Sequence, residues 1–460
     1  MKTSIILSAL ICSLGLNVSA NEGAKKAIKK LNWNGVEVVY IEDNRFPTYD
    51  MVVYFADGAL SDTKSPGMTQ HAFNFMDSGT PKYSQKELLD RIDFLGTEIG
   101  ADTTHEYTTL SLSGLAKDFN SALKDTCHML REGNYPEAVI KKELEKERQA
   151  LKSLVSSPGG LADRANREVS MGGTPYAYPV SGKLKDLDAI NPTSLREKMD
   201  YFLNNVKKRI YLTGPTSILA IEKVFKDDCK FVGKAEDFVR SADYKKVETK
   251  KANLVFVPIP DANQVQVRIG RFLNYDEITN RNLDALASDL LGGGFTSKLM
   301  REVRVKRGLT YSIGSYISSQ KQYGRAGIST FTKNETVNRL VEVINDTVTK
   351  IVKQGISDED LERTRMGLVG SHPFKFEDNK AYLLQLLYLD HVGFDYDELF
   401  SFESKLKNYS KNDVKKKVEQ IFGMNRQTIF ILGDKSIEKE LKKLEKKFGK
   451  MTVLDYNQFI

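Results

Sequence analysis

Residues 290–312 read LLGGGFTSKLMREVRVKRGLTYS, and this stretch is the most informative one in the chain. An apolar helical pattern runs into three glycines, Gly292 to Gly294, which indicate a tight bend or a close approach of the backbone. A short basic helix follows, and Gly308-Leu309-Thr310-Tyr311 then enters a predicted β-strand. The glycines do not form a phosphate-binding loop, because such loops place G-x-x-x-x-G-K-[ST] or G-x-G-x-x-G between a strand and a helix. The more specific features are Arg304 and Tyr311, at the end of the helix and the start of the strand.

The length of the chain and its first residues set the broad class of protein. A chain of 460 residues is too long for one ordinary core, so two or more domains are expected. Residues 1–20 have the form of a secretory signal peptide, with Lys2, an apolar run and the small residues Val18-Ser19-Ala20. This run is too short for a membrane anchor, and no later stretch is apolar enough to span a bilayer. We expect an exported protein, periplasmic or secreted, without a membrane span.

Cysteine content and charge add two further expectations. Cys127 and Cys229 are the cysteines that follow the predicted cleavage point. An oxidising compartment permits a disulfide, but two cysteines about a hundred residues apart do not make a framework, and we favour buried or unpaired thiols. The formal charge is +7, with basic residues gathered in 435–447, where the spacing predicts an amphipathic helix with a solvated basic face. In an exported protein, this pattern disfavours nucleic-acid binding.

The order of predicted elements occurs twice along the chain. Strands, helices, two further strands and charged helices follow one another in residues 32–214, and the same order returns after a Lys- and Asp-rich stretch. Asn191-Pro192-Thr193-Ser194 corresponds to Ser410-Lys411-Asn412-Asp413, and Ile210-Tyr211-Leu212 to Ile429-Phe430-Ile431, with one shared offset of 219 residues. We therefore predict an α+β fold of two homologous halves, each an antiparallel-rich sheet with helices on one face. The expected boundaries are signal peptide 1–20, first domain 21–225, linker 226–251 and second domain 252–460.

These features resemble the pitrilysin/insulinase family of zinc peptidases, which includes the mitochondrial processing peptidases and their bacterial two-subunit relatives. The stretch from Leu291 to Ser312 is similar to the signature of that family's second half, and Pro175–Gly182 to its His-Pro-Tyr segment. Ser65-Pro66-Gly67 and Gly79-Thr80 frame the helix that carries the active site in the family's first half. The resemblance covers nearly the whole chain after the signal peptide.

The active-site helix is where this chain departs from the family. Family enzymes carry H-x-x-E-H there, with two zinc-binding histidines and a glutamate that activates water. Counting from the framing glycines places Gln70 and Asn74 at the ligand positions and Phe73 at the general base. Carboxamides are feeble zinc ligands and phenylalanine takes no proton. The third ligand position falls at or near Ser153, with Glu147 about two turns early.

The resemblance also says what this chain retains. In two-part members of the family, one part supplies zinc and the other supplies an Arg–Tyr pair that contacts substrate, and Arg304 and Tyr311 match that pair. Residues 99–108 resemble the edge strand to which family substrates add as an extra strand, although an ordinary amphipathic strand is equally compatible. The three glycines are either a hinge or substrate-facing loop, or a tight turn between packed elements.

The resemblance implies a non-catalytic, peptide-binding subunit of an exported zinc metallopeptidase. This chain would bind no metal or cofactor itself and would supply Arg304 and Tyr311 to the zinc site of a homologous partner, with peptides or unfolded polypeptides as ligands. An alternative is a stand-alone periplasmic peptide-binding or scaffold protein. A third possibility, an active zinc endopeptidase, is disfavoured by Gln70, Phe73 and Asn74, because hydrolysis of an amide needs both a Lewis acid and a proton acceptor.

Overall fold

A computed structural model of the chain describes residues 28–233, 244–249 and 251–460. The predicted signal peptide, residues 1–20, lies outside the described residues, as do residues 234–243 and 250 of the predicted linker. The chain forms two compact units that are discontinuous in sequence. Unit 1 comprises residues 1–143, 189–240 and 374–402, and unit 2 comprises residues 144–188, 241–373 and 403–460.

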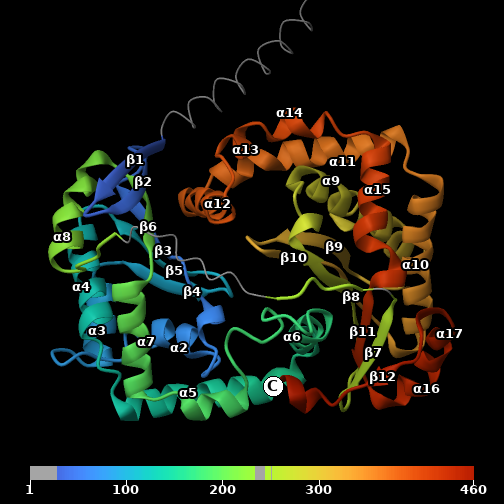
Figure 1. Cartoon of the computed structure of the whole chain (residues 1–460), viewed down its shortest axis with the longest axis horizontal. Helices are drawn as coiled ribbons and strands as arrows, with labels where there is room; N and C mark the ends of the chain where they lie inside the picture. Colours follow the sequence, from blue (N-terminus) through green and yellow to red (C-terminus); the bar gives the residue numbers. More distant parts are fainter. Residues whose placement is uncertain (1–27, 234–243, 250) are drawn as a thin grey trace, which may run out of the picture. The chain divides into compact units, whose positions relative to one another are not determined.

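Unit 1 is built on a six-stranded sheet with the order β1-β2-β6-β3-β5-β4 (Figure 1). Neighbouring strands are antiparallel except for the parallel pair β2 and β6. The strands are β1 (Ile28–Trp33), β2 (Val36–Glu42), β3 (Thr48–Phe55), β4 (Glu98–Thr103), β5 (Thr108–Leu115) and β6 (Lys208–Gly214). The helices of this unit are α2 (Met68–Asn74), α3 (Gln85–Phe94), α4 (Phe119–Glu132), α7 (Pro192–Asn205), α8 (Glu222–Asp227), α12 (Asn379–Val392) and α13 (Asp397–Phe400).

Both faces of the unit 1 sheet are buried. On one face, alternate strand residues such as Val38, Met51 and Phe55 join a core with residues of α2, α4, α7 and α8. On the other face, Val39 and Val52 pack in a separate cluster with the apolar residues of α12. Strands buried on two faces are apolar almost continuously, which is why β2 and β3 show little alternation.

Unit 2 repeats this design. Its sheet has the order β12-β7-β11-β8-β10-β9, with β7 parallel to β11 and to β12, and the other neighbours antiparallel. The strands are β7 (Asn253–Pro258), β8 (Val265–Asn274), β9 (Ile313–Ser319), β10 (Tyr323–Thr332), β11 (Thr428–Gly433) and β12 (Thr452–Val453). The helices are α6 (Pro158–Ser170), α9 (Arg281–Gly292), α10 (Val337–Gln354), α11 (Asp358–Ser371), α15 (Lys411–Phe422), α16 (Glu438–Leu441) and α17 (Glu445–Phe448), while α5 (Glu137–Ser153) and α14 (Phe402–Leu406) cross the unit boundaries.

The predicted duplication agrees with the strand order of the two sheets. Five successive strands correspond, in the order β2-β6-β3-β5-β4 in unit 1 and β7-β11-β8-β10-β9 in unit 2. In each set the first two strands, β2 with β6 and β7 with β11, form the parallel pair. The match extends to helix capping, because Asn191 and Ser410, 219 residues apart, are both N-caps in capping boxes. The α+β prediction of two sheet-and-helix halves is therefore confirmed.

The two halves exchange a helix, which the sequence-based boundaries do not describe. Helix α6 comes from the first half of the sequence but packs on β8 and β11 of unit 2, around Leu161 and Ala165. Helix α12 comes from the second half and packs on β3 and β6 of unit 1. The expectation of helices on one face of each sheet is thus incomplete, since each sheet has a second apolar face and the exchanged helix covers it.

Two local predictions are corrected. Cys127 of α4 and Cys229, just after α8, form a disulfide with their Cα atoms 4.7 Å apart, so the preference for unpaired thiols is wrong. The fold brings these residues together because α4 and α8 pack in the same core. The predicted amphipathic helix over 435–447 is a series of short α and 3-10 turns, although Ile437, Leu441 and Leu444 are buried as expected. Among the described residues, no helix is long and apolar enough to cross a membrane.

Candidate functional site

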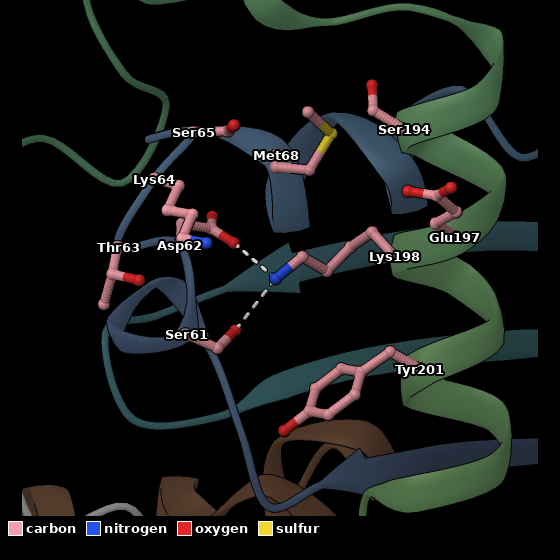
Figure 2. Close-up of a pocket in the computed structure, with 10 residues that line it drawn as sticks. All are labelled: Ser61, Asp62, Thr63, Lys64, Ser65, Met68, Ser194, Glu197, Lys198 and Tyr201. Atoms are coloured by element: carbon pink, nitrogen blue, oxygen red, sulfur yellow. Dashed lines mark hydrogen bonds and ion pairs between the residues drawn. The ribbon is translucent and has the colours of Figure 1, made fainter.

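Helix α2, which the sequence identified as the degenerate active-site helix, is anchored firmly at its N-terminal end. The Asp62 carboxylate accepts hydrogen bonds from the backbone N–H of Thr69 at 2.9 Å and from its hydroxyl at 2.7 Å. Lys198 of α7 pairs with Asp62 at 2.9 Å and donates to Ser61 Oγ at 3.2 Å (Figure 2). A cavity of about 340 Å³ lies beside this pair, between residues 61–68 and α7. Lys198 thus joins α7 to the segment before α2 through Asp62 and Ser61.

The general-base position is occupied by a core residue. Phe73 is 1% exposed, and its ring makes edge contacts with Phe55 and Phe202, each with a centroid separation of 5.2 Å. The side chain therefore contributes to the hydrophobic core of unit 1, where a carboxylate would be desolvated at high cost. Gln70 is partly buried and Asn74 is exposed at the end of the helix. Helix α2 thus places the predicted general-base position, Phe73, in the hydrophobic core of unit 1.

The remaining candidate metal ligands do not assemble either. Ser153 is exposed at the end of α5, and its hydroxyl donates to the Ala150 carbonyl at 2.8 Å. His71 is buried and stacks on Phe75, and His128 lies 3.1 Å from the Thr80 hydroxyl. Within residues 28–233, 244–249 and 251–460, no three His, Cys, Asp or Glu side chains gather as a metal site would require. That this chain binds no zinc stays a prediction.

A second cavity lies between the degenerate helix and the edge of the unit 1 sheet. Its volume is about 430 Å³, and Phe73 and Asn74 line it together with Ile92 of α3 and residues 97–101. Strand β4 is the edge strand of this sheet, as the sequence predicted for the segment after residue 99. Ile99 and Ala101 pack against the core, while Glu98 and Gly100 are exposed. An extended peptide that pairs with β4 would therefore have a pocket beside it for a side chain.

Arg304 and Tyr311 both reach the surface of unit 2. Arg304 lies in the turn of π-helix over Met300–Val305, and its guanidinium is 5.2 Å from the centroid of the Phe295 ring. Tyr311 is 78% exposed and precedes β9, which begins at Ile313. We expected Tyr311 at the start of the strand, but β9 begins two residues later, at Ile313. The Ser312 N–H donates a hydrogen bond to the Thr310 hydroxyl at 3.1 Å, and this closes a turn before the strand. Turns of π-helix are often found at functional sites.

The helix that carries Arg304 is fixed to α11 by a charge cluster. Lys298, from the signature stretch, forms an ion pair with Asp360, and Arg301 lies 3.5 Å from the same carboxylate. Burial alone would raise the pKa of Asp360, but hydrogen bonds from Lys298 and from the Ser357 cap lower it to about 2. Lys298 is therefore a structural residue, because its ammonium group is paired with the Asp360 carboxylate.

The three glycines have different roles. Gly292 ends α9 and approaches β9 so closely that a β-carbon there would lie 2.4 Å from the backbone nitrogen of Ser315. At Gly293, a β-carbon would collide with the carboxylate of Asp289. At Gly294 no described heavy atom lies within 4 Å of the β-carbon position. The first two glycines are thus needed for packing, and only Gly294 is open to a role in a loop.

We expect Gly292→Ala to lower the free energy of unfolding by about 1–3 kcal/mol, because the new methyl group meets the backbone of β9. Gly294→Ala is the matched control and is expected to change it by less than about 0.5 kcal/mol. Urea unfolding of the two variants and the wild type measures both effects. Equal effects of the two substitutions would contradict the close packing of α9 on β9.

Comparisons with known proteins show which proteins this chain resembles. Residues 189–368, which include Arg304 and Tyr311, match the family model described as peptidase M16 inactive domain. A Bacillus subtilis protein named uncharacterized zinc protease YmxG is 27% identical over 360 residues, covering 76% of this chain and 84% of that protein. A Helicobacter pylori protein named non-peptidase homolog YmxG is 22% identical over 379 residues, covering 82% and 86% of the two chains. A second Bacillus subtilis relative, 25% identical over 253 residues and covering 54% of this chain and 57% of that protein, is named probable inactive metalloprotease YmfF.

Solved structures share the fold at low sequence identity. The crystal structure of a peptidase M16 inactive domain from Pseudomonas fluorescens aligns with a TM-score of 0.78 and 20% identity, covering 88% of this chain and 98% of that one. A Helicobacter pylori protease structure aligns with a TM-score of 0.77 and 14% identity, covering 88% and 99%. Residues 189–368 therefore match the peptidase M16 inactive domain, and the chain is similar to M16 proteins over most of its length, which confirms the resemblance inferred from its sequence.

Proposed function

We propose that this chain is a non-catalytic, peptide-binding subunit of an exported zinc metallopeptidase. It supplies Arg304 and Tyr311 to the zinc site of a homologous partner subunit and holds unfolded peptides during cleavage. The observation that carries this proposal is a contrast between two groups of residues. Phe73, at the position of the general base, is in the hydrophobic core, whereas Tyr311 is 78% exposed and Arg304 reaches the surface beside Phe295.

The chemistry of the exposed pair suits contact with a peptide. A guanidinium donates a planar fork to a carbonyl or carboxylate, and a phenol hydroxyl adds a donor beside an oxyanion. Among the relatives, the names non-peptidase homolog and probable inactive metalloprotease indicate that loss of catalysis is inferred for other M16-like proteins as well. Peptide binding is supported by the edge strand β4 and its neighbouring cavity of about 430 Å³.

Export is supported by two features that do not depend on each other. Residues 1–20 have the composition of a signal peptide. The Cys127–Cys229 disulfide is a bond that persists in oxidising compartments and is rare in the cytosol.

The test combines the purified chain with a zinc-bearing homologue exported by the same cell. We expect Arg304→Ala in this chain to lower kcat/KM for peptide cleavage by the complex roughly tenfold to a hundredfold, which corresponds to loss of a charge-assisted hydrogen bond. Arg301→Ala is the matched control, since Arg301 is exposed on the same helical turn and pairs with Asp360 at 3.5 Å. Size-exclusion chromatography shows whether each variant still assembles with the partner.

Two outcomes would replace this proposal. If the purified chain alone binds stoichiometric zinc and cleaves peptides in a chelator-sensitive reaction, it is an enzyme in its own right. If no zinc-bearing homologue associates with it and the chain alone binds peptides, it is a stand-alone peptide-binding or scaffold protein.

A further inference from the structure

Two arginines on the α6 face of the unit 2 sheet have no hydrogen-bond acceptor among the described residues. Arg325 is on β10 and Arg167 is on α6, and both are partly buried. Arg167 Nη1 is buried and finds no acceptor within the described residues. Burial lowers the pKa of Arg325, and the nearby charge of Arg167 lowers it further. An arginine nevertheless stays charged in a protein, so two positive charges are held together here.

Strand register explains why these side chains meet. Arg325 and Gly327 are two residues apart on β10 and point to one face, and Tyr316 of β9 is directly opposite Gly327. The Tyr316 ring lies across β10, because a β-carbon on Gly327 would be 2.9 Å from the Tyr316 hydroxyl oxygen. This places the hydroxyl group of Tyr316 beside Arg325.

Helix α6 brings Arg167 to the same place. Asp163 of α6 accepts a hydrogen bond from Arg268 Nε of β8 at 2.5 Å, which fixes the helix to the sheet. Arg167 is four residues further along and so lies on the same side of α6. On β8, Phe272 is also four residues beyond Arg268, and it is the register partner of Arg325. The charges of Arg167 and Asp163 both act on Arg325, so α6 carries Arg167 to the neighbourhood of Arg325.

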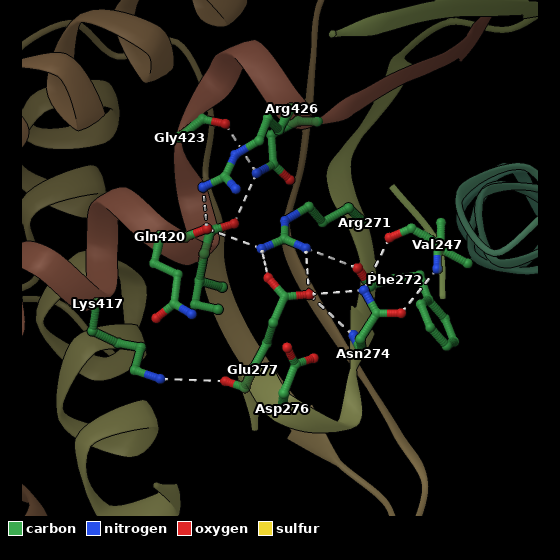
Figure 3. Close-up of polar contacts among 12 residues, drawn as sticks. Val247, Arg271, Phe272, Asn274, Asp276, Glu277, Lys417, Gln420, Gly423 and Arg426 are labelled. Atoms are coloured by element: carbon green, nitrogen blue, oxygen red, sulfur yellow. Dashed lines mark hydrogen bonds and ion pairs between the residues drawn. The ribbon is translucent and has the colours of Figure 1, made fainter. Parts of the chain in front are cut away.

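The other buried arginines of this sheet are matched with acceptors. Arg271, on the opposite face of β8, donates to Glu277 at 2.6 and 3.1 Å and to two backbone carbonyls, as Figure 3 shows. Arg268 donates to Asp163 and to the Thr330 carbonyl at 3.1 Å. Asp163 is the carboxylate near Arg325, and Arg268 already holds it. The unmatched charges are therefore specific to Arg167 and Arg325.

A buried guanidinium nitrogen without an acceptor, such as Arg167 Nη1, is costly, and such groups persist in proteins where a ligand or ion completes them. We propose that Arg167, Arg325 and Tyr316 form a carboxylate-binding site on unit 2. Two guanidinium forks and a hydroxyl donor match the lone pairs of one carboxylate. That the ligand is a carboxylate of a peptide rests on the proposed function. The anion site itself rests on the positions of Arg167, Arg325 and Tyr316. The carboxylate comes either from a peptide C-terminus or from an Asp or Glu side chain.

The experiment measures binding of three labelled ten-residue peptides of the same neutral sequence to the full exported chain. One peptide has a free C-terminal carboxylate, one is amidated, and one is amidated with an internal Glu. The variants are Arg325→Gln and Arg167→Gln, and Arg339→Gln is the matched control, because Arg339 is exposed on α10 and pairs with Glu342 at 3.6 Å. We expect each site variant to weaken binding of a carboxylate-bearing peptide roughly tenfold to a hundredfold, while the control does not.

The three peptides distinguish the two sources of the carboxylate. Loss of affinity for the free-acid peptide alone assigns the site to a peptide C-terminus, and loss for the Glu peptide assigns it to an acidic side chain. If the site variants bind every peptide as tightly as the wild type, or lose affinity for the neutral amidated peptide equally, the carboxylate site is excluded.

Thermal unfolding separates this proposal from the proposed function. If the wild type binds none of the peptides, the peptide-binding function fails, and sodium acetate then tests the site alone. Acetate that raises the Tm of the wild type and not of Arg325→Gln supports the site. The site is excluded if acetate shifts the Tm of the wild type and of Arg325→Gln equally. It is also excluded if the two proteins respond differently only when sulfate is added in place of acetate. Because Arg325 lacks a protein partner, Arg325→Gln is expected to fold with an unchanged or higher Tm without added anion.

Discussion

Replacing both Cys127 and Cys229 with serine is expected to lower the free energy of unfolding by about 2–5 kcal/mol. The disulfide joins residues 102 positions apart, and in the chain-entropy description a loop of that length gives about 4.7 kcal/mol. Both cysteines are buried in the same core as α4 and α8, so the link also holds the segment around residue 230 against α4. Arg131 of α4 reinforces this connection by donating to the carbonyls of Cys229 at 2.8 Å and Lys230 at 2.9 Å.

Guanidinium unfolding with and without dithiothreitol measures this effect. The reductant is expected to destabilise the wild type about as much as the double substitution does, and to leave the double variant unchanged. Each single variant also lacks the disulfide, so the difference between a single variant and the double variant measures the replacement of one buried sulfur by oxygen alone. A wild type that is indifferent to reductant, with a free thiol count of two after denaturation, would show that the cysteines are not paired.

The second large effect is expected at the contact between α12 and the unit 1 sheet. His391 and Glu106 form a buried pair, with Nε2 3.0 Å from Oε2 and side chains 0% and 3% exposed. The other ring nitrogen, Nδ1, lies 2.9 Å from the Tyr54 hydroxyl. Since a carboxylate only accepts, Nε2–H donates to Glu106. Truncating this fully buried ring leaves a cavity and removes a donor from the buried Glu106, so His391→Ala is expected to destabilise the protein by about 3–5 kcal/mol.

His128→Ala is the matched control for this substitution. Its ring is partly buried and lies 3.1 Å from the Thr80 hydroxyl, so its loss is expected to cost about 1 kcal/mol. A double-mutant cycle of His391→Ala with Glu106→Gln, followed by urea unfolding, isolates the coupling energy between the two side chains. Additive effects would contradict a direct interaction. A large coupling would show that the exchanged helix is attached to the loop that joins β4 to β5, next to the edge strand.

The neighbouring residue adds a second polar contact at the same helix. Asp390 accepts from Tyr211 at 2.7 Å and from Tyr396 at 2.6 Å, and Arg209 lies 3.1 Å away. Burial and the charge of Asp390 raise the pKa of Tyr396 above its ordinary range. Tyr211 lies on β6 of unit 1, so the docking of α12 depends on paired polar groups as well as on the apolar cluster.

Much of the fold was predictable from local patterns. Helix starts at Asn191 and Ser410 follow from capping residues and a proline, which act within a few residues of the chain. The duplication was visible because both halves bury the same faces and so keep similar residues at an offset of 219. The prediction that position 73 supplies no general base needs only the residue type, since a phenylalanine has no proton acceptor in any conformation.

Other features could not be predicted, because they depend on which distant surfaces meet. Cys127 and Cys229 carry no spacing signal, and their pairing is decided by the packing of α4 against α8. The exchange of α6 and α12 was hidden because an apolar helix face does not specify which of two similar sheets it covers. Tyr311 was placed in the strand because its segment has strand composition, whereas the hydrogen bond at Thr310 extends the turn.

The sequence by itself determined the α+β duplication and the absence of an H-x-x-E-H motif, and it alone led to the prediction for Arg304 and Tyr311, because these depend on residue type and spacing. Only the tertiary structure decided that Phe73 joins the core of unit 1 and that Gly292 is required by β9. It alone brought together Arg167 and Arg325, which are far apart in sequence and have no mutual pattern. The physical reason is that burial and pairing of side chains are set by contacts between elements, and those contacts leave no trace in the local sequence pattern.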